Sequence, residues 1–131
     1  MREPRLSRVR GHDIELQLYE WPGSGRPIFL AHATGFHARC WNQVVERLPG
    51  RHVLAIDMRG HGLSDKPEPP YPWREFGLDT AAVVRDLGLK DAIGVGHSKG
   101  GFAITSAAAQ VPGAFAALLL LDPVIMAPDS Y

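Results

Sequence analysis

The pentapeptide Gly96-His97-Ser98-Lys99-Gly100 is the stretch of this sequence best suited to chemistry. It follows an apolar run typical of a buried strand, residues 92–95, and precedes a run of small residues typical of a helix, residues 102–110. A serine between two glycines in this context predicts a strained turn that projects the hydroxyl away from the sheet. The flanking glycines are required because side chains there would collide with neighbouring backbone. We therefore predict that Ser98 is a nucleophile for acyl transfer.

A dinucleotide site is the rival interpretation of the same glycines. Gly94, Gly96 and Gly100 follow a strand and open a helix, and Asp122 ends the next expected strand. This arrangement partly matches a dinucleotide-binding site, in which a glycine-rich turn binds the phosphates and an acidic residue binds the ribose. The glycine spacing is looser than that motif requires, and the strand is not the first of the sheet, so we favour the nucleophile.

Composition excludes several classes of function. Lys and Arg together number 14, as do Asp and Glu, so the formal net charge is zero and favours neither nucleic acid nor an anionic membrane as partner. The length of 131 residues fits one domain. The single cysteine, Cys40, excludes an internal disulfide and suits a reducing cytoplasm, and we expect it to be buried or half-buried in a helix.

Neither a membrane segment nor a metal site is expected. Residues 1–10 are charged and lack the apolar core of a signal peptide. The most apolar run, residues 115–126, is broken by Asp122-Pro123 and is too short to span a bilayer. The six histidines do not combine into a metal-ligand spacing, so we predict no metal and no cofactor.

Apolar periodicity predicts the elements that position these residues. The expected strands cover residues 5–9, 13–20, 27–31, 53–56, 92–95 and 117–121. The expected helices cover residues 38–48, 78–87 and 102–110, and a Gly/Pro-rich loop covers 59–72. Continuous apolar strands separated by helices predict an α/β fold, a parallel-rich sheet flanked by helices.

Three segments together resemble the N-terminal half of the α/β-hydrolase family. They are Phe29 to Phe36 (FLAHATGF), Asp57 to Pro67 (DMRGHGLSDKP) and Gly94 to Gly101 (GVGHSKGG). They stand in the family's order and cover nearly the whole chain. The resemblance implies that residues 1–131 are the N-terminal portion of such a domain, an incomplete core that ends after the sixth strand.

The resemblance also implies a mechanism. Ser98 would attack the carbonyl of a small ester, thioester, lactone or amide and form an acyl-enzyme. The backbone N–H groups of Thr34 and Lys99 would form the oxyanion hole. A serine at this position resembles esterases, lipases and lactonases, whereas relatives acting on epoxides or haloalkanes carry an aspartate.

The family order of serine, then acid, then histidine is incomplete here. A full member is roughly twice as long, and this chain ends at Tyr131. Asp122 is either the acid of the triad or a strand-end cap before Pro123. We do not expect His32 or His97 to be the general base: the resemblance implies that His32 holds the oxyanion loop and that His97 points away from substrate.

Other polar and aromatic residues have structural interpretations. Asp57 and Arg59 are expected to fix their turn through hydrogen bonds. The Lys99 side chain either lines the pocket or is solvated, and we favour solvation. Trp73 and Phe76 either border the pocket or anchor the following helix.

Two functions from different classes remain. The first is a serine hydrolase whose histidine lies outside this chain, and the second is a catalytically incomplete fold that acts as an interaction or remnant module. Since the four leucines of strand 117–121 would be exposed at an uncovered edge, we expect a partner there, either a second copy or a complementary C-terminal chain.

Overall fold

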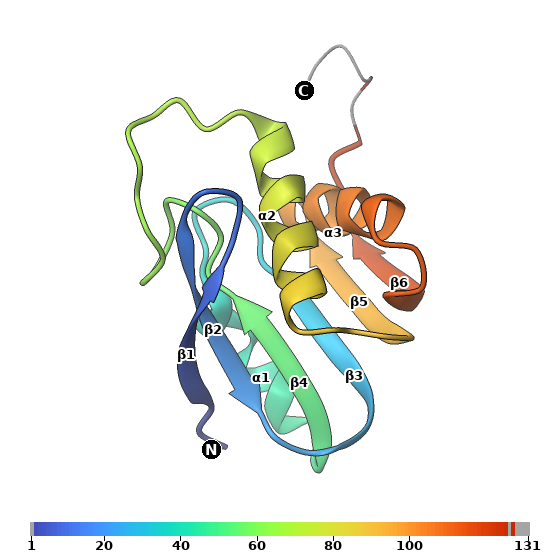
Figure 1. Cartoon of the computed structure of the whole chain (residues 1–131). Helices are drawn as coiled ribbons and strands as arrows, with labels where there is room; N and C mark the ends of the chain where they lie inside the picture. The colour runs from blue at the N-terminus through green and yellow to red at the C-terminus, as the bar shows by residue number, and fades with distance from the viewer. Residues whose placement is uncertain (1, 126, 128–131) are drawn as a thin grey trace.

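The computed structural model describes residues 2–125 and residue 127. The described strands pair into one six-stranded sheet with the order β1-β2-β4-β3-β5-β6 (Figure 1). The strands are β1 (Arg5–Arg10), β2 (Glu15–Trp21), β3 (Ser24–Ala31), β4 (Arg51–Ile56), β5 (Ala92–His97) and β6 (Phe115–Leu121). The helices are the short 3-10 helix η1 (Ala38–Trp41), α1 (Asn42–Glu46), α2 (Trp73–Asp86) and α3 (Lys99–Gln110).

Most of the sheet is parallel. Strand β3 pairs in parallel with β4 and β5, and β5 pairs in parallel with β6, whereas β2 pairs antiparallel with β1 and β4. The predicted α/β fold with a parallel-rich sheet flanked by helices is therefore confirmed. In such a sheet the carboxyl ends of the parallel strands share one edge, and ligands bind beyond that edge.

Helices cover both faces of the sheet, and the two largest apolar clusters lie beneath them, while a smaller cluster joins Met58, Phe76 and Ala103 (Figure 1). On one face, Val83 of α2 and Ile104 of α3 pack against Phe29 of β3. On the other face, Ala38 of η1 and Val45 of α1 join the second cluster. Burying each large apolar side chain contributes about 1.5–3 kcal/mol, so the two clusters fix the sheet between its helices.

All three helices differ in extent from their sequence predictions, and α3 begins at Lys99 instead of residue 102. Residues 38–48 form η1 and the five-residue α1 rather than one helix, and Cys40 is exposed there, so the prediction of a buried or half-buried cysteine is wrong. Helix α2 begins at Trp73 instead of residue 78. The added turn contains Gly77, although glycine disfavours helices. A Cβ atom at this position would overlap the side chain of Ser106, so glycine allows α2 to pack closely on α3.

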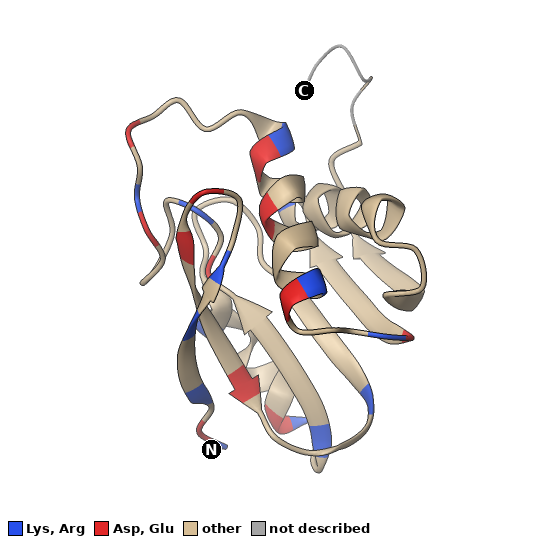
Figure 2. Ribbon diagram, viewed as in Figure 1, with Lys and Arg blue, Asp and Glu red and all other residues tan. Residues whose placement is uncertain are grey.

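Strand β6 lies at one edge of the sheet, as predicted. Figure 2 shows charged residues on α2, on β1 and in loops, whereas β6 carries none. The expectation that all four leucines are exposed is wrong, because side chains alternate across a strand. Leu119 and Leu121 are 55% and 42% exposed, whereas Leu118 and Leu120 pack against the core.

Among the residues that the structure describes, no helix is long and apolar enough to cross a membrane. The same residues contain no group of three or more His, Cys, Asp or Glu side chains placed to hold a metal ion.

Candidate active site

Ser98 occupies the tight turn between β5 and α3, at the carboxyl edge of the parallel strands. Its backbone has φ 53° and ψ −115°, a conformation that costs a residue with a side chain roughly 1–3 kcal/mol. Backbone hydrogen bonds hold it there: its N–H donates to the Leu121 carbonyl at 3.0 Å, and its carbonyl accepts from the Gly101 N–H at 2.9 Å. Its hydroxyl makes no hydrogen bond with any described residue, so it is available to a bound molecule.

The glycines beside Ser98 let backbone segments pass closer than a side chain allows. A Cβ atom on Gly96 would lie 2.6 Å from the carbonyl oxygen of Gly100. A Cβ atom on Gly100 would overlap the carbonyl oxygen of Ala31 at the end of β3. The first turn of α3 is therefore pressed against the end of β3, which brings the start of the helix next to the loop that follows that strand.

The substitution Gly100→Ala is expected to destabilise the fold by about 3 kcal/mol or more, because the new methyl group meets backbone that cannot rotate away. Gly101→Ala is the comparison variant and should cost less: its Cβ atom would meet a ring atom of Pro123 at 2.8 Å, so a shift is required, but only of the segment that follows the last strand. Urea unfolding followed by circular dichroism measures both. Equal stability of the two variants would contradict the close approach at Gly100.

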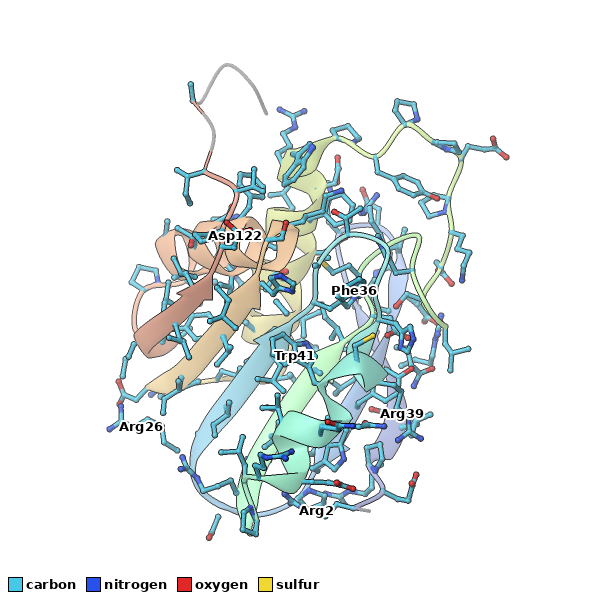
Figure 3. The ribbon with its side chains drawn as sticks, turned by 180° about the vertical axis from the view of Figure 1, so that it is seen from behind. Arg2, Arg26, Phe36, Arg39, Trp41 and Asp122 are labelled. Atoms are coloured by element: carbon cyan, nitrogen blue, oxygen red, sulfur yellow. The ribbon has the colours of Figure 1, made fainter. Side chains whose placement is uncertain are left out.

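The backbone N–H groups of Thr34 and Lys99 make no hydrogen bond with the described residues. Thr34 lies in a turn closed by the Phe36 N–H, which donates to the Ala33 carbonyl at 3.1 Å. Lys99 is the first residue of α3, where helix N–H groups lack intrahelical partners. Strands β3 and β5 are neighbours, so both donors start from adjacent strand ends. Figure 3 shows the loop of Phe36 at the same end of the sheet as Asp122.

Two neutral imidazoles hold the loop that carries Thr34. His32 donates from Nδ1 to the Ala33 carbonyl at 2.8 Å and accepts at Nε2 from the Met58 N–H at 3.0 Å. His61 accepts at Nε2 from the Gly35 N–H at 3.0 Å. His32 has the loop-holding contacts expected of it, whereas the bond from His61 to Gly35 joins residues 26 positions apart and had no signal in the sequence.

Burial lowers the pKa of His32 to about 4, because the imidazole is 1% exposed and its charged form would lose its hydration. An unfolded histidine titrates near 6.5, so between pH 6.5 and pH 4 the unfolded chain binds more protons than the folded one. The free energy of unfolding must therefore fall as the pH falls through this window, by about 2–3 kcal/mol from this group alone.

We expect His32→Gln to remove this dependence, since glutamine retains an acceptor for the Met58 N–H and does not titrate. Urea unfolding of both proteins at neutral pH and near pH 4.5 measures this dependence. Between the two pH values, the free energy of unfolding should fall by about 2–3 kcal/mol more in the wild type than in the variant. Parallel pH dependences in the two proteins would show that His32 is not the buried neutral base described.

Asp57 and Arg59 have separate structural partners. Asp57 is fully buried and accepts from the Tyr19 hydroxyl at 2.8 Å, the Ala38 N–H at 2.8 Å and the Leu63 N–H at 2.9 Å. Its hydrogen bonds tie the turn after β4 to β2 and η1, so the structural interpretation of Asp57 has direct support. Arg59 instead pairs with a residue that sequence reasoning missed, Asp79 of α2.

Asp122 directly follows β6, and the residues on either side of it form backbone hydrogen bonds with Ser98. The Val124 N–H donates to the Ser98 carbonyl at 3.3 Å, which complements the bond from the Ser98 N–H to Leu121. The carboxylate of Asp122 is exposed and has no hydrogen-bond partner among the described residues. The fold therefore brings Asp122 to the edge that carries Ser98, without an imidazole between them in the described part of the chain.

His97 lies in a small cavity on the η1 side of the sheet. The cavity has a volume of about 100 Å³ and is lined by His32, Ala33, Phe36, Cys40, Trp41 and His97. The His97 ring meets Phe36 edge to face, with centroids 6.0 Å apart. None of the described histidines hydrogen-bonds the Ser98 hydroxyl.

The side chain of Lys99 is buried, so the prediction of a solvated lysine is wrong. Its Nζ atom lies 4.4 Å from the ring centroid of Trp73 and 4.2 Å from that of Phe76. Both rings come from the first turn of α2, which lies beside α3. The two aromatic residues therefore do more than anchor α2: they hold a cation beside Ser98.

The sequence of this chain is similar to a known protein family and to several known proteins. A family model described as the alpha/beta hydrolase family matches residues 28–131. The chain is 36% identical over 101 residues to 2-(acetamidomethylene)succinate hydrolase of Mesorhizobium japonicum, an alignment covering 76% of this chain and 36% of that protein. It is 33% identical over 119 residues to lipase LipV of Mycobacterium tuberculosis, covering 86% of this chain and 42% of the lipase.

The fold of this chain is also similar to those of solved structures. An N-acyl homoserine lactone degrading enzyme superposes with a TM-score of 0.79 at 29% identity, covering 94% of this chain and 49% of that enzyme. The chain thus spans less than half the length of each of these three proteins.

Proposed function

Because this chain belongs to the alpha/beta hydrolase family, we propose that it carries the nucleophile and oxyanion hole of a serine hydrolase that cleaves a carboxylic ester or a related acyl compound. The observation that supports this most directly is the turn at Ser98. Backbone hydrogen bonds hold this non-glycine residue at φ 53°, and its hydroxyl has no hydrogen-bond partner among the described residues. Strain of this kind persists where the surrounding structure fixes a reactive geometry.

In the proposed reaction, the Ser98 oxygen attacks the substrate carbonyl and its proton passes to the leaving group. The N–H groups of Thr34 and Lys99 receive the oxyanion, and such preorganised donors are each worth about two to three orders of magnitude in rate. Water then attacks the acyl-enzyme, releasing the acid and restoring the serine proton. Relatives described as a lipase, as a lactone-degrading enzyme and as a hydrolase of an acetamido compound are consistent with acyl chemistry.

The general base of this reaction is proposed to lie outside the chain. His32 cannot act as the base without releasing the loop that it holds, because both its nitrogens are engaged. Asp122 is our candidate for the acid that orients the incoming histidine, since it stands at the carboxyl edge beside Ser98. Residues 1–131 are then the N-terminal portion of the catalytic domain. The dinucleotide alternative finds no parallel in the matched family.

The exposed edge of β6 supports a partner at that side. Its outward leucines and unpaired backbone groups suit a further strand, supplied by a second copy or by a C-terminal segment.

We propose that the protein is located in the cytoplasm, because its single cysteine, Cys40, is unpaired.

Covalent labelling tests the proposed function. The chain is treated with a fluorophosphonate, alone and after addition of the C-terminal segment of a curated relative, and its intact mass and labelled peptide are determined. One adduct on Ser98 in either sample is the expected result. The absence of an adduct in both samples would overturn the hydrolase and leave a catalytically incomplete interaction module.

A further inference from the structure

Lys99 carries a buried positive charge that the proposed reaction does not use. Only its backbone N–H enters the oxyanion hole, whereas its side chain runs toward α2 and ends between Trp73 and Phe76. The residue as a whole is 9% exposed, and burial lowers the pKa of its ammonium group. An ammonium group in such a place loses hydration, which aromatic faces replace only in part.

No carboxylate among the described residues pairs with this ammonium group. The two acidic residues in the first two turns of α2, Glu75 and Asp79, already have cationic partners. Glu75 lies 2.7 Å from the His12 ring and 3.5 Å from Arg59, and Asp79 lies 2.7 Å from Arg59. A buried cation without an anion is an unfavourable arrangement for stability alone, so a partner that arrives from solution would complete the site.

The position of the charge indicates what that partner is. Lys99 follows Ser98 directly and begins α3, so its side chain is anchored one residue from the attacking oxygen. A molecule whose carbonyl sits between Ser98 and the two oxyanion donors can reach the ammonium group only with its acyl portion or its leaving group. An acyl chain of a few carbons ending in a carboxylate supplies the missing anion and a charge-assisted hydrogen bond.

We propose that Lys99 is a specificity-determining residue that binds a carboxylate on the acyl part of the substrate, so that the preferred substrates are half-esters or half-amides of short dicarboxylic acids. This inference rests on the proposed function and narrows its substrate class. In the reaction, the bond between the Ser98 oxygen and the acyl carbon forms as the bond to the leaving group breaks. Water then cleaves the acyl-enzyme, and the product is a dicarboxylate.

A pair of esters matched in shape measures this preference. Para-nitrophenyl hemisuccinate ends in a carboxylate, and para-nitrophenyl isocaproate ends in an uncharged group of the same outline. The quantity compared is the ratio of their kcat/KM values, in which any common change in folded fraction or oxyanion stabilisation cancels. With the C-terminal segment of a curated relative present to supply the general base, the wild type should favour hemisuccinate, and Lys99→Met should lower the ratio about tenfold to a hundredfold.

Two further variants serve as controls. Lys99→Arg keeps the charge and should retain most of the preference, whereas Lys90→Met removes an exposed lysine before β5 and should leave the ratio unchanged. The melting temperature gives a separate readout: Lys99→Met should melt at or above the wild-type temperature, because an unpaired buried charge is removed. An unchanged ratio in Lys99→Met, or a large drop in its melting temperature, would overturn the assignment.

Binding separates failure of this inference from failure of the proposed function. Titration calorimetry with succinamate, a half-amide, uses the Ser98→Ala background, where no acyl-enzyme forms. Adding Lys99→Met to that background should weaken binding at least about tenfold. Equal binding would overturn the role of Lys99 whatever the activity, whereas inactivity toward both esters together with Lys99-dependent binding would overturn only the acyl-enzyme.

Discussion

With the C-terminal segment of a curated relative added to supply the general base, Ser98→Ala is expected to lower the rate of ester hydrolysis by at least about a thousandfold and to abolish the acyl adduct. The reason is that the variant keeps the oxyanion donors of Thr34 and Lys99, which are backbone groups, but has no atom to attack the carbonyl. Some turnover above water can persist, since an oxyanion hole and binding alone retain catalysis. The measurement is release of para-nitrophenol, combined with intact mass of the protein.

A second serine on the same helix provides the matched control. Ser106 lies on α3, where its hydroxyl accepts a hydrogen bond from the Gln110 side chain at 3.0 Å. Ser106→Ala should retain the wild-type rate and adduct. If Ser98→Ala hydrolyses the ester as fast as Ser106→Ala does, the reaction does not pass through Ser98.

The buried ion pair between Arg59 and Asp79 is expected to have the largest effect on stability. The guanidinium group donates from Nε at 2.7 Å and from Nη2 at 2.8 Å, so the pair is bidentate, and the two side chains are 9% and 3% exposed. Asp79 also accepts from the His12 N–H at 2.8 Å. The pair therefore ties the turn between β1 and β2, the loop after β4 and helix α2 together.

Asp79→Ala should destabilise the fold by about 3–5 kcal/mol, because the buried Arg59 charge would keep only a longer contact to Glu75 at 3.5 Å and a hydrogen bond to the neutral His12 carbonyl. Urea unfolding at neutral pH measures the loss. The control is Glu3→Ala, which breaks an ion pair with Arg39 in which the glutamate is 68% exposed and should cost less than about 1 kcal/mol. Losses of similar size in the two variants would mean that the buried pair contributes no more than a surface contact.

The chain's own residues determined the fold class and the turn of the nucleophile. Gly96, after an apolar strand, encodes the turn locally, because a Cβ atom there would meet the backbone of Gly100 and Gly101 a few positions away, whereas the steric demand at Gly100 comes from Ala31 at the end of β3. Alternation and apolar runs likewise predicted every described strand to within a few residues at each end. The edge position of β6 also followed from the sequence, through the family resemblance of its motifs.

Contacts between distant segments decided the rest. The sequence around Lys99 carries no sign of burial, since the rings that cover it lie more than twenty positions earlier, at Trp73 and Phe76. The sequence also did not predict the partner of Arg59, because Asp79 becomes its neighbour only when α2 packs beside the turn after β4. Local pattern fixes backbone geometry over a few residues, whereas the environment of a charge depends on which elements the packed core brings together. Tertiary structure alone therefore placed an unpaired cation beside the candidate nucleophile.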